Sequence, residues 1–291
     1  MKFKILLWFF ITTFASHYAI SIKVSGAVKV YTGEGKLQTL ALSPDGKKLA
    51  FSSTQRDNKG DIVLLNLATK EKQNLPISDA LESQPVFSPD GKFLYYFSNE
   101  KTFGGIYRIQ LPVSGAPHSE QISPAGYWCE FPDISADGKY LVYYSRREGS
   151  YSLYKMDLNT RKEMRLTQSS FFDFGPKFSS DGKSVFFYSN REGQFAIHKL
   201  NLSNLTVEKL NNPNGFTFQP SRDFHGKFLF AVSNAAGNND IYLIGTSPDQ
   251  DPVQITKDPA QDMYPVMDTK KRILYFISNR EGAYAIYKTG F

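Results

Sequence analysis

Six copies of one turn, four strand-like runs per copy and one unassigned strand near the N-terminus predict an all-β fold, a single six-bladed β-propeller of four-stranded antiparallel blades. The turn motif Ser-Pro-Asp-Gly-Lys occurs at residues 43–47 and 88–92, and degenerate copies follow at 135–139, 179–183, 223–227 and 268–272. The turn glycines stand at positions 46, 91, 138, 182 and 226, which gives steps of 45, 47, 44 and 44 residues. A repeat of this length is typical of stacked supersecondary units.

The second unit shows the four strands of one blade most clearly. A short run at 85–88 leads into the turn, where proline, aspartate and glycine favour the required dihedral angles. The next run, 92–98, is almost continuously apolar, as expected for a strand covered on both faces. Runs at 106–111 and 120–123 complete the unit, and no segment between the runs predicts a helix.

The two ends of the repeat array predict how the ring closes. The sixth unit ends at Phe291 after its third strand, and the segment 27–32 belongs to no other unit. If this segment pairs with the last unit, two open sheet edges disappear. We therefore expect an N-terminal strand to complete the last blade. The expected units are 37–79, 80–123, 124–168, 169–212, 213–257, and 258–291 together with 27–35.

The N-terminus predicts export. Two lysines among the first four residues precede an apolar stretch over residues 5–15. This pattern is typical of a secretory signal peptide, here residues 1–21, which leaves 22–291 as one propeller domain. The alternative is a retained membrane anchor, although the stretch is short for a span of about 20 residues. We expect the processed chain to be periplasmic or secreted, with no stable membrane span.

Composition excludes several classes of protein. Cys129 is the only cysteine among the 291 residues, so an exported chain without an internal disulfide must depend on a large core. The formal net charge is +6, or +4 without the two lysines of the signal peptide, and the basic residues form no clustered stripe. Nucleic-acid binding is therefore not expected.

The repeats resemble those of TolB-type propellers. In that family an aromatic residue and a Ser-Pro-Asp-Gly-Lys turn precede an apolar strand, a Ser-x-Arg-x-Gly loop, an Ile-Tyr pair and a Leu-Thr strand. The loop recurs here at 145–149, 189–193 and 278–282, and the terminal pair recurs at 166–167 and 255–256. The resemblance covers residues 28–291 and implies a periplasmic or secreted binding platform. We expect the loop arginines Arg191 and Arg280 to bond neighbouring backbone.

Alignment of the units on the proline of each first strand identifies candidate binding residues. The inner strands of a propeller line its axis, so residues that enter these strands are expected to ring one mouth of the channel. Three positions before the proline, units two, four and six carry the carboxylates Glu82, Asp173 and Asp262 at threefold spacing. The corresponding residues of the other units are Leu37, Cys129 and Thr217. Neighbouring candidates are Tyr127, Trp128, Glu130, Phe131, Phe172, Phe174, Phe216, Phe218 and Tyr264.

These residues predict a mouth where aromatic side chains bind a partner segment and carboxylates bind a basic group or a cation. Calcium is the cation considered, with Glu82, Asp173 and Asp262 as its ligands, and no other cofactor is expected. The alternative interpretation is that the aromatic side chains fill gaps between blades and the acids are solvated.

The motifs favour binding over catalysis. The sequence has no G-x-S-x-G elbow, no P-loop and no His/Cys metal spacing. We predict a monomeric, non-catalytic scaffold that recognises a protein or peptide partner in the cell envelope through the axial mouth and the loop face. The alternative is an enzyme or binding protein acting on a saccharide in the axial pocket, with its carboxylate pair drawn from Glu82, Glu130, Asp173 and Asp262.

Overall fold

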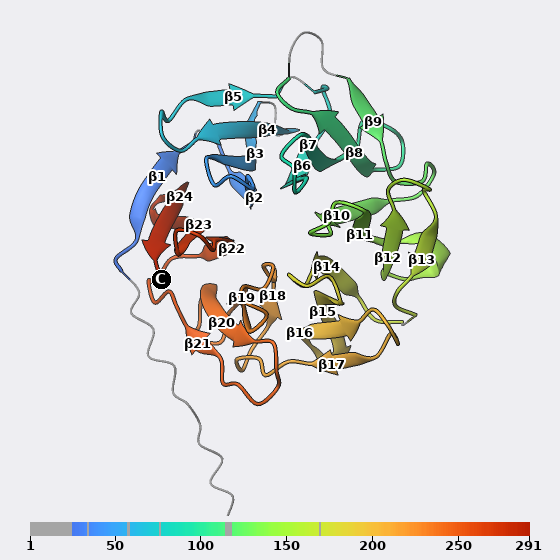
Figure 1. Ribbon diagram of the computed structural model, residues 1–291. Helices are drawn as coiled ribbons and strands as arrows, with labels where there is room; N and C mark the ends of the chain where they lie inside the picture. The colour runs from blue at the N-terminus through green and yellow to red at the C-terminus, as the bar shows by residue number, and fades with distance from the viewer. Residues whose placement is uncertain (1–24, 34, 57–58, 76, 114–117, 169) are drawn as a thin grey trace, which may run out of the picture.

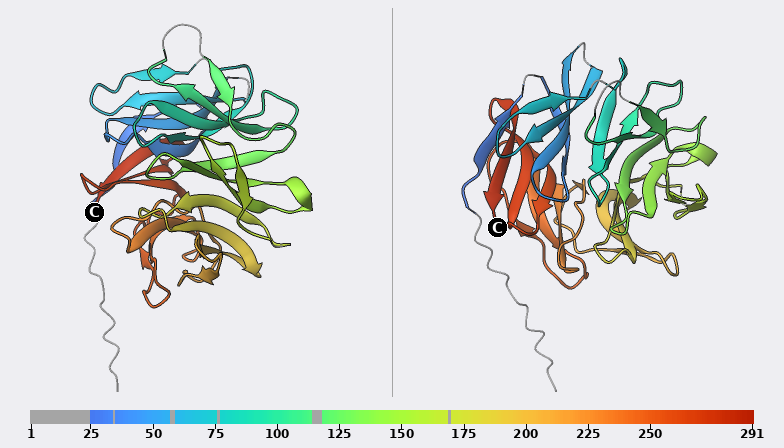
Figure 2. Two further views of the ribbon diagram at one scale, coloured as in Figure 1. Left: turned by 45° about the vertical axis from the view of Figure 1, so that its right-hand side comes forward. Right: turned by 45° about the horizontal axis from the view of Figure 1, so that its top comes forward.

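The computed structural model describes residues 25–33, 35–56, 59–75, 77–113, 118–168 and 170–291. Six four-stranded sheets stand around a central axis (Figures 1 and 2), which confirms the predicted all-β fold and six-bladed propeller. The predicted signal peptide, residues 1–21, lies outside the described residues. Within the described ranges, no helix has the length and apolar content that a membrane crossing requires.

Each blade is an antiparallel sheet whose strands run in sequence order from the axis to the rim. Blades 1 and 2 consist of β2 Leu37–Leu42, β3 Lys48–Arg56, β4 Lys59–Asn66 and β5 Lys72–Asn74, and of β6 Glu82–Phe87, β7 Phe93–Ser98, β8 Gly105–Gln110 and β9 Ser119–Gln121. Blades 3 and 4 consist of β10 Cys129–Ile134, β11 Tyr140–Ser145, β12 Ser152–Asp157 and β13 Glu163–Arg165, and of β14 Asp173–Phe178, β15 Ser184–Glu192, β16 Gln194–Asn201 and β17 Val207–Lys209. Blade 5 consists of β18 Thr217–Phe218, β19 Phe228–Ser233, β20 Asp240–Gly245 and β21 Val253–Gln254.

Blade 6 closes the ring with strands from both ends of the chain. It contains β22 Asp262–Asp268, β23 Ile273–Glu281, β24 Ala283–Gly290 and, as its outermost strand, β1 Val28–Thr32. Strand β1 pairs antiparallel with β24, from Val28 opposite Lys288 to Thr32 opposite Ala285. The expectation that an N-terminal strand completes the last blade is therefore confirmed.

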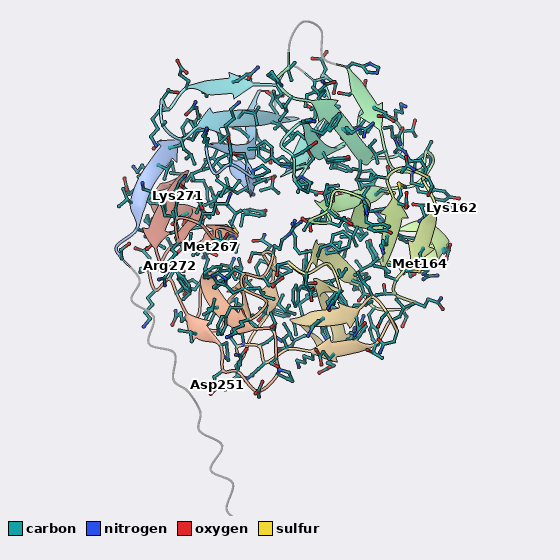
Figure 3. The ribbon with its side chains drawn as sticks, viewed as in Figure 1. Lys162, Met164, Asp251, Met267, Lys271 and Arg272 are labelled. Carbon is teal, nitrogen blue, oxygen red and sulfur yellow. The ribbon has the colours of Figure 1, made fainter. Side chains whose placement is uncertain are left out.

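The core consists of one cluster of buried side chains at each interface between neighbouring blades. Between blades 1 and 2, for example, Ile62 packs with Tyr96, and between blades 5 and 6 Phe230 packs with Tyr287. Side chains fill the space between adjacent sheets all around the ring (Figure 3). The second and third strands are covered on both faces, which explains their continuous apolar runs.

The repeated turn is held by its own side chains. In blade 1 the Ser43 hydroxyl donates to Asp45 at 2.6 Å and accepts from the Lys48 amide at 2.9 Å. The bond from Ser43 lowers the pKa of the Asp45 carboxyl. Gly46 has φ of 66°, a conformation that glycine adopts without strain. The same Ser–Asp contact recurs at 88/90, 135/137 and 179/181.

The inner strands of blades 1, 2, 3, 4 and 6 bulge at the residue before the aligned proline, or before Leu40 in blade 1, and in blade 5 the corresponding Gln219 directly follows β18. These six residues have φ between 46° and 57°, and they are Thr39, Gln84, Phe131, Gly175, Gln219 and Tyr264. All six residues line a cavity of about 80 Å³ on the axis. Three of these residues donate their backbone amide to the side chain of the equivalent residue in the preceding blade. The pairs are Gln84 to Thr39, Phe131 to Gln84 and Tyr264 to Gln219.

Candidate functional site

The two faces of the ring differ in chemistry. We call the face that carries the inter-blade connections and the hairpins between second and third strands the connection face. The opposite face, which carries the Ser-Pro-Asp-Gly turns, is the turn face. The axis therefore has one mouth on each face.

Exposed aromatic side chains gather on the connection face. Among the described residues, five aromatic side chains are the large hydrophobic residues most exposed on this face, with 41–51 % of their surface accessible. They are Phe103, Tyr127, Phe171, Phe172 and Phe216, and we call them the aromatic arc. They come from loops of blades 2 to 5 on the connection face.

A second layer of aromatic rings supports the arc. The Phe174 ring lies 4.9 Å from Tyr144 and 5.1 Å from Tyr151, and Tyr151 lies 4.9 Å from Phe172. Of the predicted binding residues, Phe174 is thus half-buried in this layer, whereas Phe172 is exposed. Rings in edge-on contact at these distances hold each other in fixed positions. The arc is therefore presented on a rigid base.

Three other predicted aromatic residues are also partly buried. Trp128 packs against Phe97 at 5.4 Å between ring centres, and Phe218 lies 6.4 Å from Tyr188. Tyr264, a bulge residue, lines the axial cavity and packs on the core between blades 6 and 1. The sequence analysis selected these residues but missed Phe103, which lies outside the aligned window, and Phe171, which occupies the same aligned position as Tyr127.

The expectation that the positions three before each proline ring the mouth is wrong. All six are at most 1 % exposed, and they are Leu37, Glu82, Cys129, Asp173, Thr217 and Asp262. The reason is the bulge, since the residue that faces the axis is the one directly before the proline. Counting back along a regular strand therefore identified the side chains that point into the blades.

Two of the predicted acids form buried ion pairs. Arg191 donates to Asp173 at 2.9 Å, and Arg280 donates to both oxygens of Asp262 at 2.9 and 3.0 Å. The expectation that these arginines bond backbone was therefore wrong, because each binds a carboxylate and a serine hydroxyl of its own blade. Burial nevertheless raises the pKa of Asp262, while the bonds from Ser278 and Arg280 act in the opposite direction.

Blade 3 carries the arginine without the acid. Cys129 replaces the aspartate, and Arg147 occupies the arginine position. The Arg147 guanidinium turns to Glu163 at 2.8 Å, and both side chains are largely buried. The loop arginine thus finds a carboxylate of its own blade even where the inner strand offers none.

Blade 2 carries the acid without the arginine. Glu82 accepts bonds from Ser78 and Ser98, and Glu100 stands where blades 4 and 6 have arginine. Burial, with the nearby charges of Asp61 and Glu100, raises the pKa of Glu82 to about 7. This carboxyl therefore exchanges its proton near neutral pH.

We expect Glu82 to make the stability of the protein depend on pH. A carboxyl with a raised folded pKa contributes stability that is complete below its ordinary value of 4.5 and is lost as pH rises through about 7. The loss amounts to roughly 3 kcal/mol at 1.36 kcal/mol per pKa unit. Glu82→Gln, which copies the protonated acid, should remove this slope in urea titrations at pH 4.5 to 8.

A second variant separates charge from shape. Glu100→Arg would place a guanidinium where Arg191 and Arg280 stand in their blades, and it should flatten the same slope by holding Glu82 ionised. If the unfolding free energy falls equally between pH 4.5 and 7 in the wild type and in both variants, the pH dependence comes from groups other than Glu82.

The predicted acids do not assemble a metal or catalytic site. Glu82, Glu130, Asp173 and Asp262 belong to four different blades, and each has a partner in its own blade, Glu130 the Tyr144 hydroxyl. Throughout the described part of the chain, no three His, Cys, Asp or Glu side chains come together as metal ligands.

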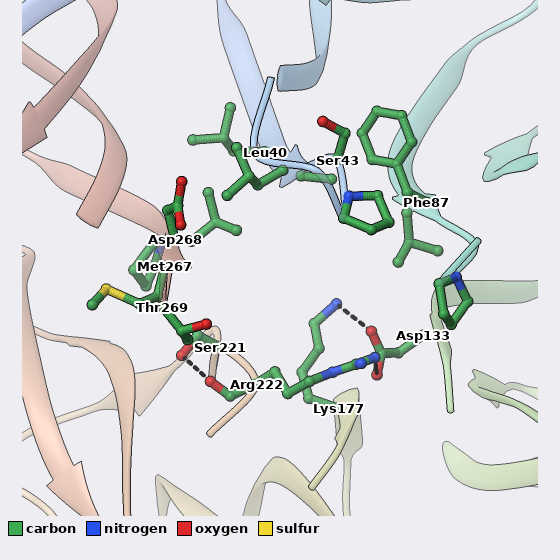
Figure 4. A pocket seen from close by; sticks show the side chains of 18 of the residues that line it. Leu40, Ser43, Phe87, Asp133, Lys177, Ser221, Arg222, Met267, Asp268 and Thr269 are labelled. Carbon is green, nitrogen blue, oxygen red and sulfur yellow. Dashed lines mark hydrogen bonds and ion pairs between the residues drawn. The ribbon is translucent and has the colours of Figure 1, made fainter. Parts of the chain in front are cut away.

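The mouth on the turn face opens into a larger pocket of about 410 Å³ (Figure 4). Asp133, only 5 % exposed, is its charged centre. It accepts the Phe178 amide at 2.9 Å and Arg222 at 2.9 Å, and Lys177 Nζ lies 3.7 Å away. One carboxylate of blade 3 is thus held by groups of blades 4 and 5.

Burial, together with the charge of Arg222, lowers the pKa of Lys177, while Asp133 acts in the opposite direction. The sequence does carry a signal for this site. Asp133 and Lys177 directly follow their prolines, where the other units have the uncharged residues Ala41, Val86, Ser221 and Val266. A charged residue in an otherwise apolar inner strand marks a departure from the repeat.

The sequence matches a known family over most of its length. The model of the family described as TolB beta propeller domain matches residues 15–152 and 116–235, which together span more than half of the chain. Similar solved structures include a putative TolB from Agrobacterium tumefaciens, with a TM-score of 0.69 and 20 % identity over 90 % of this chain and 92 % of that chain.

Two further structures share the fold at lower similarity. TolB from Acinetobacter baumannii has a TM-score of 0.62 and 19 % identity over 78 % of this chain and 59 % of that one. Oligogalacturonate lyase from Vibrio parahaemolyticus has a TM-score of 0.61 and 15 % identity over 91 % and 93 %. Such identities show the fold alone, and one fold hosts different functions. The family match and the closed ring of six repeats show that this chain belongs to the TolB beta-propeller domain family.

Proposed function

We propose that this protein is an exported, non-catalytic scaffold that binds a protein or peptide partner on its connection face. The observation that carries the proposal is the aromatic arc, five exposed aromatic side chains on loops of consecutive blades on one face. Large aromatic residues supply most of the energy at many protein interfaces. A soluble domain that leaves several of them exposed together marks an interaction site.

Rigidity supports the same role. Phe172 rests on the half-buried layer around Phe174 and Tyr151, so a partner would meet a preformed surface and would lose little ordering entropy. Arg146, exposed beside the arc with its guanidinium 5.2 Å from the Tyr151 ring, adds a cation at its border. The partner segment would therefore combine apolar side chains with an acceptor for this arginine.

The acids argue against a saccharide enzyme in the axial mouth. A glycosidase needs two carboxyl groups about 5–10 Å apart that face the substrate. Glu82, Asp173 and Asp262 are buried, and each has a hydrogen-bond partner in its own blade. The basic and apolar N-terminal stretch supports export, so the partner would belong to the cell envelope.

We expect the double variant Phe172→Ala/Phe216→Ala to lose partner capture. Removing two exposed aromatic anchors should weaken binding by at least about 2 kcal/mol, or roughly thirtyfold. The measurement is capture from envelope extract by the processed chain, followed by photo-crosslinking from position 172. The crosslinked partner should be the captured one.

The chain offers a matched control. Met164 on the rim of blade 3 (Figure 3) and Leu205 on the turn face are also exposed, at 43 % and 41 %. Met164→Ala/Leu205→Ala removes apolar surface elsewhere and should capture the partner as the wild type does. Equal capture by both double variants, with unchanged melting curves, would place the binding surface on another part of the ring.

A further inference from the structure

The turn-face pocket has two walls of different character. Leu40, Val86 and Val266, from blades 1, 2 and 6, line one part of it, and Asp133, Lys177 and Arg222, from blades 3 to 5, form the other. Figure 4 shows Leu40 across the pocket from Lys177 and Arg222. Its volume of about 410 Å³ lies in the range of small-molecule sites. It opens on the face opposite the aromatic arc, so it is separate from the proposed partner surface.

The charged wall carries more positive than negative charge. Asp133 is the counter-ion of two cations, Arg222 at 2.9 Å and Lys177 at 3.7 Å. The other carboxylates of the pocket have their own partners. Asp223 accepts the Ser180 amide and hydroxyl, and Asp268 lies 3.3 Å from Lys271. With Lys270, which also lines the pocket, and Lys271 beside Asp268, the cations Lys177, Arg222, Lys270 and Lys271 outnumber the carboxylates Asp133, Asp223 and Asp268 by one.

The two cations also keep donors for a ligand. Lys177 Nζ lies beyond hydrogen-bond distance of Asp133, and its side chain is 29 % exposed at the pocket. Arg222, 34 % exposed, uses one terminal nitrogen for Asp133 and the Ile134 carbonyl. Among the residues that the structure describes, no hydrogen bond engages Lys177 Nζ or the second terminal nitrogen of Arg222. Figure 4 shows both side chains converging on Asp133 across the pocket floor.

We propose that this pocket binds a small organic monoanion, a carboxylate with a short apolar chain. The carboxylate would accept bonds from Lys177 and Arg222, and the apolar chain would lie along Leu40, Val86 and Val266. One net positive charge matches one carboxylate, and the apolar wall favours a hydrocarbon part over a fully hydrated ion.

The test is calorimetric titration of the processed wild-type chain with hexanoate, hexanol, hexylamine and inorganic phosphate. Hexanoate should bind one per chain, at least about tenfold tighter than the other three, because a hydrogen bond to a charged group contributes more than the factor of ten that 1.4 kcal/mol represents. Its affinity should fall as salt is added. Hexanol binding as tightly as hexanoate, or phosphate binding more tightly, would overturn the proposal without any variant.

Variants locate the site. Lys177→Met keeps the apolar stem and removes the charge, and it should weaken hexanoate binding at least about tenfold. Lys92→Met makes the same charge change on a turn lysine outside the pocket, and it should bind as the wild type does. Unchanged binding in Lys177→Met and in Arg222→Met would place hexanoate elsewhere. Phe172→Ala/Phe216→Ala should bind hexanoate normally, so failure of the partner surface and failure of this pocket are distinguishable.

Discussion

Removal of residues 25–32 is expected to abolish cooperative folding of the propeller. These residues supply the whole of strand β1, and β24 would become an exposed edge at the seam between the first and last blades. An unpaired edge exposes backbone donors and acceptors to pairing with other chains. We therefore expect aggregation as well as loss of stability.

The contacts of β1 account for the size of the effect. Tyr31 packs 5.3 Å from the Phe51 ring of blade 1, so the strand joins the core between the first and last blades. Ser25 accepts the Gly290 amide at 2.7 Å, and Lys29 pairs with Glu281. Apolar side chains contribute about 1.5–3 kcal/mol each and hydrogen bonds about 1 kcal/mol. Their sum is comparable with the 5–15 kcal/mol that keeps an ordinary domain folded.

Circular dichroism melting and size-exclusion chromatography measure this outcome, with a chain that begins at Ser25 as the control. A pair of point variants isolates packing from chain length. Tyr31→Ser, on the packed side of β1, should lower the melting midpoint by several degrees. Val28→Ser, where the side chain is 56 % exposed, should leave it nearly unchanged. A monomeric truncation with a sharp transition near the control's midpoint would show that the ring does not depend on β1.

The fold was predictable because the same turn and strand pattern recurs in all six units. The turn spacing predicted the number of blades. The segment 27–32, which belongs to no other unit, predicted the closing strand, and this strand pairs with the last blade. A degenerate copy such as 268–272 still forms a turn, with Asp268 accepting the amides of Lys270 and Lys271. In a ring, each blade constrains its neighbours, so one weak copy does little harm.

The direction of the inner-strand side chains was not predictable from alternation. A positive φ at Gln84, Phe131 or Tyr264 is rare for residues with a Cβ, and nothing in those residue types announces it. The bulge shifts the strand by one position and reverses which side chains face the axis. The bulge therefore explains why the residues predicted to ring the mouth are buried instead.

The ion pairs, in contrast, were visible in the sequence. Blades 4 and 6 both have an aspartate three positions before the proline and an arginine two positions after the loop serine. In each blade the two residues are 18 positions apart, as in Asp173 and Arg191. Both are absent from blade 5, which has Thr217 and Ala235 at those positions. Comparing the blades with one another would have paired them.

We expect Asp262→Thr to destabilise the protein by about 3 kcal/mol, because it leaves the Arg280 guanidinium, 15 % exposed, without its counter-ion. Blade 5 supplies the compensating change. Asp262→Thr/Arg280→Ala reproduces its Thr217 and Ala235, and Thr217 donates to Ser233 at 3.2 Å in a buried site. The double variant should therefore recover at least about 1 kcal/mol in urea unfolding, even though Arg280 also loses its contacts with Phe276 and Tyr287.

A surface ion pair provides the scale for this effect. Glu208→Gln removes the partner of Lys199 at a half-exposed site, and it should cost less than about 1 kcal/mol. If Asp262→Thr costs no more than Glu208→Gln, or if the double variant is less stable than Asp262→Thr by the full cost of Arg280→Ala alone, the two buried charges are not coupled. The loop arginines would then stabilise the blades through ring packing, and the pairing of acid and arginine in blades 4 and 6 would need another cause.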